Sequence, residues 1–298
     1  MSDPTGEMRT LAKKLLESGD VDTIIGWEKG SLWYQSPPVF ITRAEDADRL
    51  VFDDFAINSL VTYLLDERDS DKKIGVFVKG CDSRGLVRIL QDQQFPRERV
   101  YVIGLPCSGK KDPKQAQNKS AQDSDQVPLA VKCQECIYPN PVISDVTIGD
   151  AVEAKPAVED RFATVKEIEA KTADEKYALW SSEYSKCLRC FACRNVCPAC
   201  NCRDCTFDNC RPRILEKENT TMQNFVYHLT RAFHVAGRCV ECGECERVCP
   251  VGVSIMDLNK KIIKEIDTIF GPYEAGVKLD DTPPPLGTYK TEDPEEFM

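Results

Sequence analysis

The sequence predicts an α/β N-terminal domain with parallel strands, followed by an α-helical domain whose core is organised around cysteine residues. Two observations support this division. The first 150 residues contain an apolar strand, a helix and a second apolar strand in succession, which is the order of a parallel β-α-β unit. Residues 187–270 instead contain most of the 16 cysteines together with two amphipathic helical segments.

The N-terminal elements follow from hydrophobic spacing. Residues 46–66 carry apolar side chains at helical spacing and are expected to form a helix. Residues 74–78 and 100–105 are short apolar runs, which are typical of buried strands. Asp82 is expected to cap a helix that extends to about Gln93. Because that helix connects the two strands, they should be parallel neighbours.

The second half is predicted to be helical and to end in a tail. Residues 151–186 are expected to form a helical linker, with a charged helix over 164–185. Periodic apolar residues predict further helices over 221–235 and 254–270. Residues 271–298 contain five prolines and an acidic end, so we expect an extended tail that is either disordered or ordered only against a partner.

Composition limits the partners and the compartment. A net charge of −10 argues against binding to nucleic acid or to an anionic membrane surface. There is no apolar segment long enough for membrane insertion and no signal sequence at the N-terminus. Cysteines in metal-ligand spacing without a signal sequence are typical of a reducing compartment, so a cytoplasmic location is expected.

Two segments repeat the cysteine pattern C-x2-C-x2-C-x3-C-P. This pattern is the ligand run of bacterial ferredoxins that hold two [4Fe-4S] clusters, in which the fourth cysteine of each run binds the other cluster. A pair of zinc sites is the alternative, but zinc usually takes two separated C-x2-C pairs. The runs therefore predict a bacterial ferredoxin-like dicluster core. The first cluster is expected on Cys187, Cys190, Cys193 and Cys249, and the second on Cys239, Cys242, Cys245 and Cys197.

A third cysteine set follows from the predicted topology. Cys81 and Cys107 each come just after one of the two predicted parallel strands. The carboxyl ends of parallel strands share one edge of a sheet, where open α/β folds bind ligands. Cys133 and Cys136 form a C-x2-C pair after the next apolar segment and could complete a third cluster site. Alternatively, Cys81 and Cys107 are buried thiols and the pair binds zinc or does redox chemistry.

Four cysteines remain in an insert over residues 200–210. They are expected to form a metal site, either for zinc or for a further [4Fe-4S] cluster. They are Cys200, Cys202, Cys205 and Cys210. The only two histidines, His228 and His234, lie in the helix predicted over 221–235 and are expected to be packed and hydrogen-bonded rather than metal ligands.

Several phrases resemble one known family. "KGCDSRGLVRIL", "VYVIGLPCSG", "KCQEC" and "SDVTIGD" are similar to the beta subunits of deazaflavin-reducing hydrogenases and related formate dehydrogenases, over roughly residues 25–150. The resemblance implies an iron–sulfur cluster on Cys81, Cys107, Cys133 and Cys136. Residues 187–270 resemble the dicluster domain fused to such subunits and the small iron–sulfur subunit of heterodisulfide reductases.

The chain departs from that family after Asp150. Family members that reduce the deazaflavin continue with a long region that completes an FAD site, whereas here the ferredoxin run begins about 35 residues later. No Gly-rich nucleotide loop replaces that region, so an FAD site is not carried over.

The sequence therefore favours a non-catalytic iron–sulfur subunit of a cytosolic anaerobic oxidoreductase complex. It would relay single electrons between a flavin-bearing partner and a catalytic partner, such as a hydrogenase, a formate dehydrogenase or a heterodisulfide reductase-like subunit. The alternative is a flavin-dependent reductase of a deazaflavin or a similar two-electron carrier. A zinc-rich scaffold is a third interpretation. A bound yellow flavin would indicate the reductase, and colourless protein with zinc would indicate the scaffold.

Overall fold

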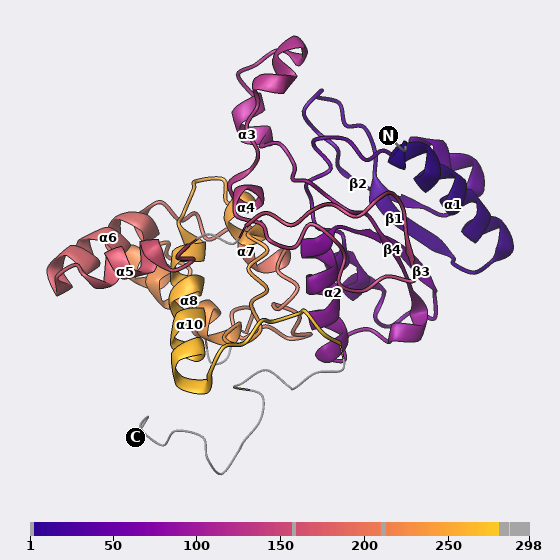
Figure 1. Ribbon diagram of the computed structural model, residues 1–298. Coiled ribbons are helices and arrows are strands. Elements are labelled where there is room, and N and C mark those ends of the chain that lie inside the picture. The colour runs from indigo at the N-terminus through magenta and orange to yellow at the C-terminus, as the bar shows by residue number, and fades with distance from the viewer. Residues whose placement is uncertain (1–2, 157–158, 210–212, 280–285, 287–298) are drawn as a thin grey trace. The chain divides into compact units, whose positions relative to one another are not determined.

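The computed structural model describes residues 3–156, 159–209, 213–279 and 286. The chain forms two compact units (Figure 1). The first comprises Met1–Ala157 together with Gly276–Leu279, and the second comprises Val158–Ala275.

The first unit is built on a mixed sheet in which parallel pairing dominates. Its strands lie in the order β2-β1-β3-β4-β5, and only the β1–β2 pair is antiparallel. The predicted parallel pairing is confirmed, because Ile74 of β3 is paired with Val100 of β4. The strands are β1 (Thr23–Trp27), β2 (Pro38–Ile41), β3 (Ile74–Val78), β4 (Val100–Gly104) and β5 (Val146–Thr147).

Every residue of β1 and β3 is buried, as expected for strands covered on both faces. The helices of this unit are α1 (Pro4–Ser18), α2 (Gly80–Gln91), α3 (Pro113–Ala116) and α4 (Val131–Gln134). Figure 1 shows α1 and α2 flanking the strands. The predicted α2 is present but begins earlier than expected. Lys79 is its N-cap, and the Asp82 carboxylate accepts a hydrogen bond from the Lys79 amide at 3.2 Å.

The helix predicted over residues 46–66 is wrong. This segment contains two short 3-10 helices, Ala44–Arg49 and Val61–Glu67, joined by irregular backbone. The joining backbone is held by other elements instead: Leu50 bridges to Glu28, and the Trp27 indole donates a hydrogen bond to the Asn58 carbonyl at 3.0 Å. Most of the apolar side chains in this segment are buried, as expected. The helical spacing therefore predicted which side chains are buried, but not the conformation of the backbone.

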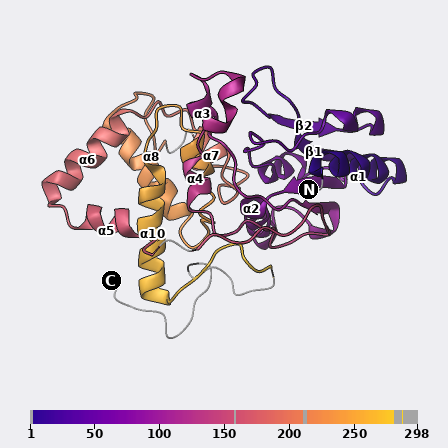
Figure 2. The same ribbon diagram turned by 45° about the horizontal axis from the view of Figure 1, so that its top comes forward.

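The second unit is helical. Its helices are α5 (Ala163–Glu169), α6 (Ala173–Ser185), α7 (Ala192–Asn195), α8 (Thr221–His234), α9 (Glu244–Arg247) and α10 (Ile255–Phe270). The predicted helices over 221–235 and 254–270 correspond to α8 and α10, which lie side by side (Figures 1 and 2). The single helix predicted over 164–185 is instead divided into α5 and α6. Thr172 and Glu175 form a capping box that starts a new helix there.

Part of the predicted tail packs on the chain itself. The Gln91 side chain donates a hydrogen bond to the Lys278 carbonyl at 2.9 Å, and Leu279 packs against the core of the first unit. The other tail residues, 280–285 and 287–298, lie outside the described residues, apart from Leu286. Among the helices that the structure describes, none has the length and apolar character needed to span a membrane.

Candidate iron–sulfur sites

The two cysteine runs have the same backbone conformation, displaced by 52 residues (239 − 187 = 52). The second residue after the first cysteine is left-handed in both, with φ of 51° at Arg189 and at Glu241. The fourth is also left-handed, with φ of 60° at Phe191 and 67° at Gly243. The sequence repeat is therefore a structural repeat.

This backbone is suited to holding anionic sulfur. Left-handed φ is costly for residues other than glycine, and it persists where a site requires it. Alternation of left- and right-handed residues turns successive N–H groups into one concave surface, a common feature of iron–sulfur sites. The Arg189 amide donates to the Cys187 Sγ at 3.3 Å, and the Glu241 amide makes the equivalent hydrogen bond to Cys239.

The first candidate set contains cysteines of both runs. Burial raises the pKa of the Cys187 thiol, and the neighbouring thiols of Cys193, Cys249 and Cys190 raise it further. Cys249 of the second run thus lies beside three cysteines of the first. Cys187, Cys193 and Cys249 are buried, and Cys190 is exposed. This is the grouping expected for the first cluster.

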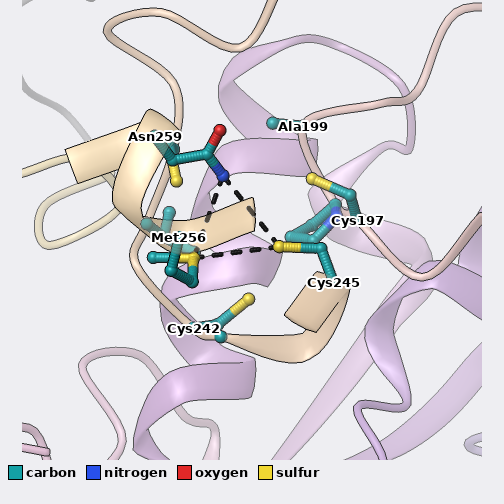
Figure 3. A pocket seen from close by; sticks show the side chains of 10 residues that line it. Cys197, Ala199, Cys242, Cys245, Met256 and Asn259 are labelled. Atoms are coloured by element: carbon teal, nitrogen blue, oxygen red, sulfur yellow. Dashed lines mark hydrogen bonds between the residues drawn. The ribbon is translucent and has the colours of Figure 1, made fainter. Parts of the chain in front are cut away.

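The second candidate set surrounds a small pocket (Figure 3). Its lining includes Cys197 of the first run and three cysteines of the second, Cys239, Cys242 and Cys245. Burial raises the pKa of Cys239 and of Cys242 to about 12, and the nearby Cys197 contributes to both shifts. Four thiols around one largely apolar cavity are the donor set that a [4Fe-4S] cluster requires, so the residues fit this group. The other lining residues are Pro198, Ala199, Val240, Gly243, Met256 and Asn259.

Helix α8 supplies side-chain hydrogen bonds to the first set. His228 Nε2 lies 3.3 Å from the Cys187 Sγ, and the Tyr227 hydroxyl lies 3.3 Å from the Cys193 Sγ. The His228 ring also stacks on Tyr184, with 4.9 Å between ring centroids. Burial lowers the pKa of His228 to about 4, with a further contribution from the Arg231 charge, so the ring is neutral at pH 7.

The prediction that both histidines are packed is thus confirmed for only one of them. His228 is buried, whereas His234 is exposed at the end of α8. The neighbouring Phe233 is exposed as well, whereas Arg231 and Ala232 of the same turn are buried, so one side of this turn faces away from the core.

Helix α10 supplies weaker contacts to the second set. The Asn259 amide lies 3.9 Å from the Cys245 Sγ and 3.8 Å from the Met256 sulfur. The Met256 sulfur is itself 3.8 Å from the Cys245 Sγ (Figure 3). Long contacts to sulfur contribute less than the shorter ones made by His228 and Tyr227.

Arg231 lies near cysteines of both sets. Its side chain is 2% exposed, and its Nη2 donates to the Cys193 carbonyl at 3.1 Å. Burial opposes its charge, but the nearby thiols, first those of Cys197 and Cys245, outweigh burial and raise the pKa of Arg231. A permanent positive charge is therefore buried among the ligand candidates. Nothing in the sequence pattern had pointed to this residue.

The four cysteines of the N-terminal set are also neighbours. Burial raises the pKa of Cys81, in the first turn of α2, and Asp82 and Cys107 act in the same direction. Burial likewise raises the pKa of Cys136, together with Cys133 and Cys107. Cys107 follows β4, so the set gathers at the carboxyl ends of β3 and β4, as the topology predicted.

Buried lysines accompany this set. Lys79 is ion-paired with Asp82 at 2.8 Å, and its ammonium lies 4.0 Å from the Trp27 ring centroid. Lys110 donates to the Asp53 carbonyl at 2.8 Å. Burial lowers the pKa of Lys110, although the nearby Cys107 opposes that shift. Neither lysine was expected from the sequence. The signal for Lys79 is its place between a buried strand and Cys81.

The cysteines of the 200–210 insert have different surroundings. The Cys200 thiol makes a hydrogen bond to Cys197 and lowers the pKa of Cys197. Cys202 is exposed, and Cys205 makes a hydrogen bond with Arg194. Cys210 lies outside the described residues. Within the part of the chain that the structure describes, no three His, Cys, Asp or Glu side chains converge to hold a single metal ion. A metal site here stays a prediction.

Comparison with known proteins identifies two sequence families. Residues 71–206 match the family formed by the C terminus of the beta subunit in coenzyme F420 hydrogenases and dehydrogenases. Residues 183–253 match the family described as "4Fe-4S dicluster domain".

Two curated relatives are similar over most of their length. The F420-dependent formate dehydrogenase subunit beta of Methanocaldococcus jannaschii is 22% identical, over 94% of this chain and 93% of the relative. The F420-dependent formate dehydrogenase 1 subunit beta of Methanococcus maripaludis is 26% identical, over 95% of this chain and 93% of the relative.

Among solved structures, a chain of the F420-reducing [NiFe] hydrogenase complex from Methanosarcina barkeri is 22% identical, with a TM-score of 0.32. The match covers 37% of this chain and 40% of that one. The resemblance stated from the sequence is confirmed by the two family matches. The chain is thus similar to the coenzyme F420 hydrogenase/dehydrogenase beta-subunit family over residues 71–206 and to the 4Fe-4S dicluster domain family over residues 183–253.

Proposed function

We propose that this chain is an iron–sulfur subunit that relays single electrons between a flavin-bearing partner and a catalytic partner in an oxidoreductase complex. The observation that carries the proposal is the exchange of cysteines between the two runs. Cys249 joins the set begun by the first run, and Cys197 joins the set begun by the second. Two interlocked sets in one unit form a pair of neighbouring redox sites.

A [4Fe-4S] cluster, when bound, accepts and releases one electron. The chain's own residues bury the ligands, donate hydrogen bonds to sulfur and keep Arg231 charged nearby. In the first set, Cys190 is exposed while its companions are buried, which brings one edge of that set to the surface of the second unit. An exposed edge is what electron exchange with a partner protein requires.

The named relatives indicate the class of complex. Both are beta subunits of F420-dependent formate dehydrogenases, and this chain aligns with nearly their whole length. We therefore propose that its partners include a formate dehydrogenase- or hydrogenase-type catalytic subunit. The first alignment spans 359 positions, so at least 61 of them (359 − 298) lie opposite gaps in this chain. We propose no FAD site for this chain, and therefore a relay rather than a flavin-dependent reductase.

We propose four segments within the chain. Residues 1–150 form the α/β domain, with a third cluster on Cys81, Cys107, Cys133 and Cys136. Residues 151–186 form the helical linker, residues 187–270 the dicluster domain and residues 271–298 the tail. The close approach of the four N-terminal thiols supports the third cluster.

Anaerobic purification of the full chain tests the proposal. Three clusters require about 12 iron atoms per chain. We expect that iron content, the broad brown absorbance of clusters and no bound flavin. Stoichiometric flavin would support the reductase, and zinc without iron would support a scaffold. About 16 iron atoms would assign a fourth cluster to Cys200, Cys202, Cys205 and Cys210, and about 12 iron atoms with one zinc would assign zinc to them.

A further inference from the structure

The two ferredoxin-type sets share a backbone but differ in the side chains around them. One backbone N–H donor is equivalent in both runs, because the repeat places Arg189 and Glu241 in the same conformation. The fourth cysteines differ: Cys249 accepts from the Val253 amide at 3.4 Å, and Cys197 accepts from the amides of Ala199 and Cys200. Side-chain donors are not equivalent. The first set has the ring nitrogen of His228 and the hydroxyl of Tyr227, each 3.3 Å from a ligand sulfur.

The second set has only weak side-chain donors among the described residues. The Asn259 amide is 3.9 Å from the Cys245 Sγ, and the Cys200 thiol bonds to Cys197. A thiol is a poor hydrogen-bond donor, and a contact of 3.9 Å is long.

The charged residues of the two loops also differ. Like the side-chain hydrogen bonds, they favour added negative charge on the first set more than on the second. In the repeat, Arg189 corresponds to Glu241 and Arg194 corresponds to Glu246, so cations in the first run are replaced by anions in the second. The second run additionally has Glu244 in place of Ala192 and Arg247 in place of Asn195, but these two side chains form an ion pair at 2.8 Å, so their charges largely cancel. Glu241 lies two residues from Cys239, and Glu244 lies two residues from Cys242, so both carboxylates are close in sequence to ligand candidates.

We propose that these differences fix the order of reduction: the cluster held by Cys187, Cys190, Cys193 and Cys249 accepts an electron before the cluster held by Cys239, Cys242, Cys245 and Cys197. This inference rests on the proposed function and adds a direction to it. Tyr227 and His228 are positioning residues that act through ligand sulfurs.

The physical reason is the charge gained on reduction. A reduced cluster carries one more negative charge than an oxidised one. Hydrogen bonds to sulfur and nearby cations stabilise that charge, and nearby carboxylates destabilise it. Because the His228 ring nitrogen and the Tyr227 hydroxyl each lie 3.3 Å from a ligand sulfur and can donate a hydrogen bond to it, both favour reduction of the first set. Arg231 lies near both sets and therefore does not by itself distinguish them.

The order has a consequence for the relay. The first set also contains Cys190, which is exposed, so the electron comes to rest on the cluster that has one ligand at the surface of the second unit. We therefore infer that electrons leave the dicluster domain through the first set and enter through the second.

The test is a redox titration of the full chain followed by EPR spectroscopy. Cys190→Ser and Cys242→Ser, at equivalent positions of the repeat, identify which signal belongs to which set. In the unmodified chain we expect the first set to be reduced at the higher potential. Tyr227→Phe and His228→Leu should each reduce its one-electron equilibrium constant about tenfold, which is about 59 mV, and leave the second set unchanged.

Further variants serve as matched controls. His228→Gln retains a donor and should recover part of the loss. His234→Gln changes the exposed histidine of the same helix and should shift neither set. Arg189→Gln removes the Arg189 charge together with its hydrogen bonds to the Lys217 and Glu218 carbonyls, and Glu241→Gln removes a charge that pairs with Arg161 at 3.6 Å. The first variant should lower the potential of the first set, and the second should raise that of the second set. If His228→Leu loses iron, Arg189→Gln and Glu241→Gln still test the proposal.

Two results would overturn the inference. One is reduction of the second set first, and the other is unchanged potentials in both Tyr227→Phe and Arg189→Gln with full iron content. Either would leave the relay function standing. A chain that assembles no clusters would instead refute the proposed function itself.

Discussion

The backbone carbonyl of Tyr138 approaches Gly80 so closely that a β-carbon at Gly80 would stand 1.9 Å from the carbonyl oxygen. Gly80 begins α2, directly before Cys81, and Tyr138 follows Cys136 by two residues. The absence of a side chain at Gly80 therefore lets the segment that carries Cys133 and Cys136 come up to the helix that carries Cys81.

Gly80→Ala should separate the N-terminal cysteines. Because the clash is with backbone, the loop must move, and overpacking of this kind costs about 1–3 kcal/mol. On the three-cluster proposal, iron should fall from about 12 to about 8 atoms per chain. The EPR signals of the two ferredoxin-type sets should persist and provide the internal control. An unchanged iron content would show that the third set is not a cluster site.

Lys79→Met should strongly destabilise the first unit. Lys79 and Asp82 are almost completely buried, with 3% and 1% of their side chains exposed, and removal of one partner leaves the other charge unpaired. Such a loss costs about 3–5 kcal/mol in the free energy of unfolding. Chemical denaturation measures it, with Lys73→Met, at an exposed lysine, as the control. The double variant Lys79→Met/Asp82→Asn should lose less than the sum of the single variants.

Cys249→Ala tests the exchange of ligands between the runs. The variant should remove or convert the EPR signal that Cys190→Ser also perturbs, although Cys190 and Cys249 belong to different runs. The signal perturbed by Cys242→Ser should be retained. Loss of that second signal alone would mean that each run holds its own cluster.

Arg231→Leu should lower the reduction potentials of both ferredoxin-type clusters. Its buried charge lies near cysteines of both sets, so its removal makes the extra electron less favourable on either one. The redox titration described above measures this, with iron content as the check on assembly. A shift confined to one cluster would show that Arg231 acts on that site alone.

Glu169→Gln should weaken the attachment of α5 to α10. Hydrogen bonds from Lys261 and Lys264 lower the pKa of Glu169 to about 2. A carboxylate with a lowered pKa in the folded chain stabilises the fold at pH values above its pKa in the unfolded chain, which is about 4.3. This stabilisation is lost as the pH falls toward 2. The difference in Tm between Glu169→Gln and the unmodified chain should therefore be the same at pH 7 and pH 5.

That difference should shrink in about 1 M salt, because the ion pair is partly exposed. Glu167→Gln, at an exposed position of α5, is the control and should change Tm little. A difference that persists in high salt would mean that packing, and not charge, makes the contact.

The sequence was most informative where chemistry fixes spacing. The ferredoxin runs impose ligand positions, and parallel strand order brings Cys81 and Cys107 to one sheet edge, so those neighbours could be predicted without coordinates. The spacing of apolar residues was less informative about the conformation of the backbone. Residues 46–66 bury apolar side chains from irregular backbone, because bonds from β1 and neighbouring loops replace helical hydrogen bonds.

The surroundings of the clusters could not be predicted. His228 and His234 are six residues apart on one helix, yet one contacts a ligand sulfur and the other is exposed. The buried Arg231 and Lys79 resemble ordinary surface charges in the sequence. Their burial depends on tertiary neighbours, here the thiols near Arg231 and the Asp82 carboxylate and Trp27 ring near Lys79.

The exchange of Cys197 and Cys249 also bears on how the chain matures. The first set lacks its last ligand until Cys249 has been synthesised, 56 residues after Cys193 (249 − 193). The second set needs Cys197 to stay available until the second run has emerged from the ribosome. With the proposed exchange of ligands, neither run completes its cluster from its own cysteines, and a chain interrupted just before Cys249 would leave three cysteines of the first set without their fourth ligand. The proposed exchange therefore makes iron insertion into this domain a late event in biosynthesis, and full iron content would report that the entire domain has been made.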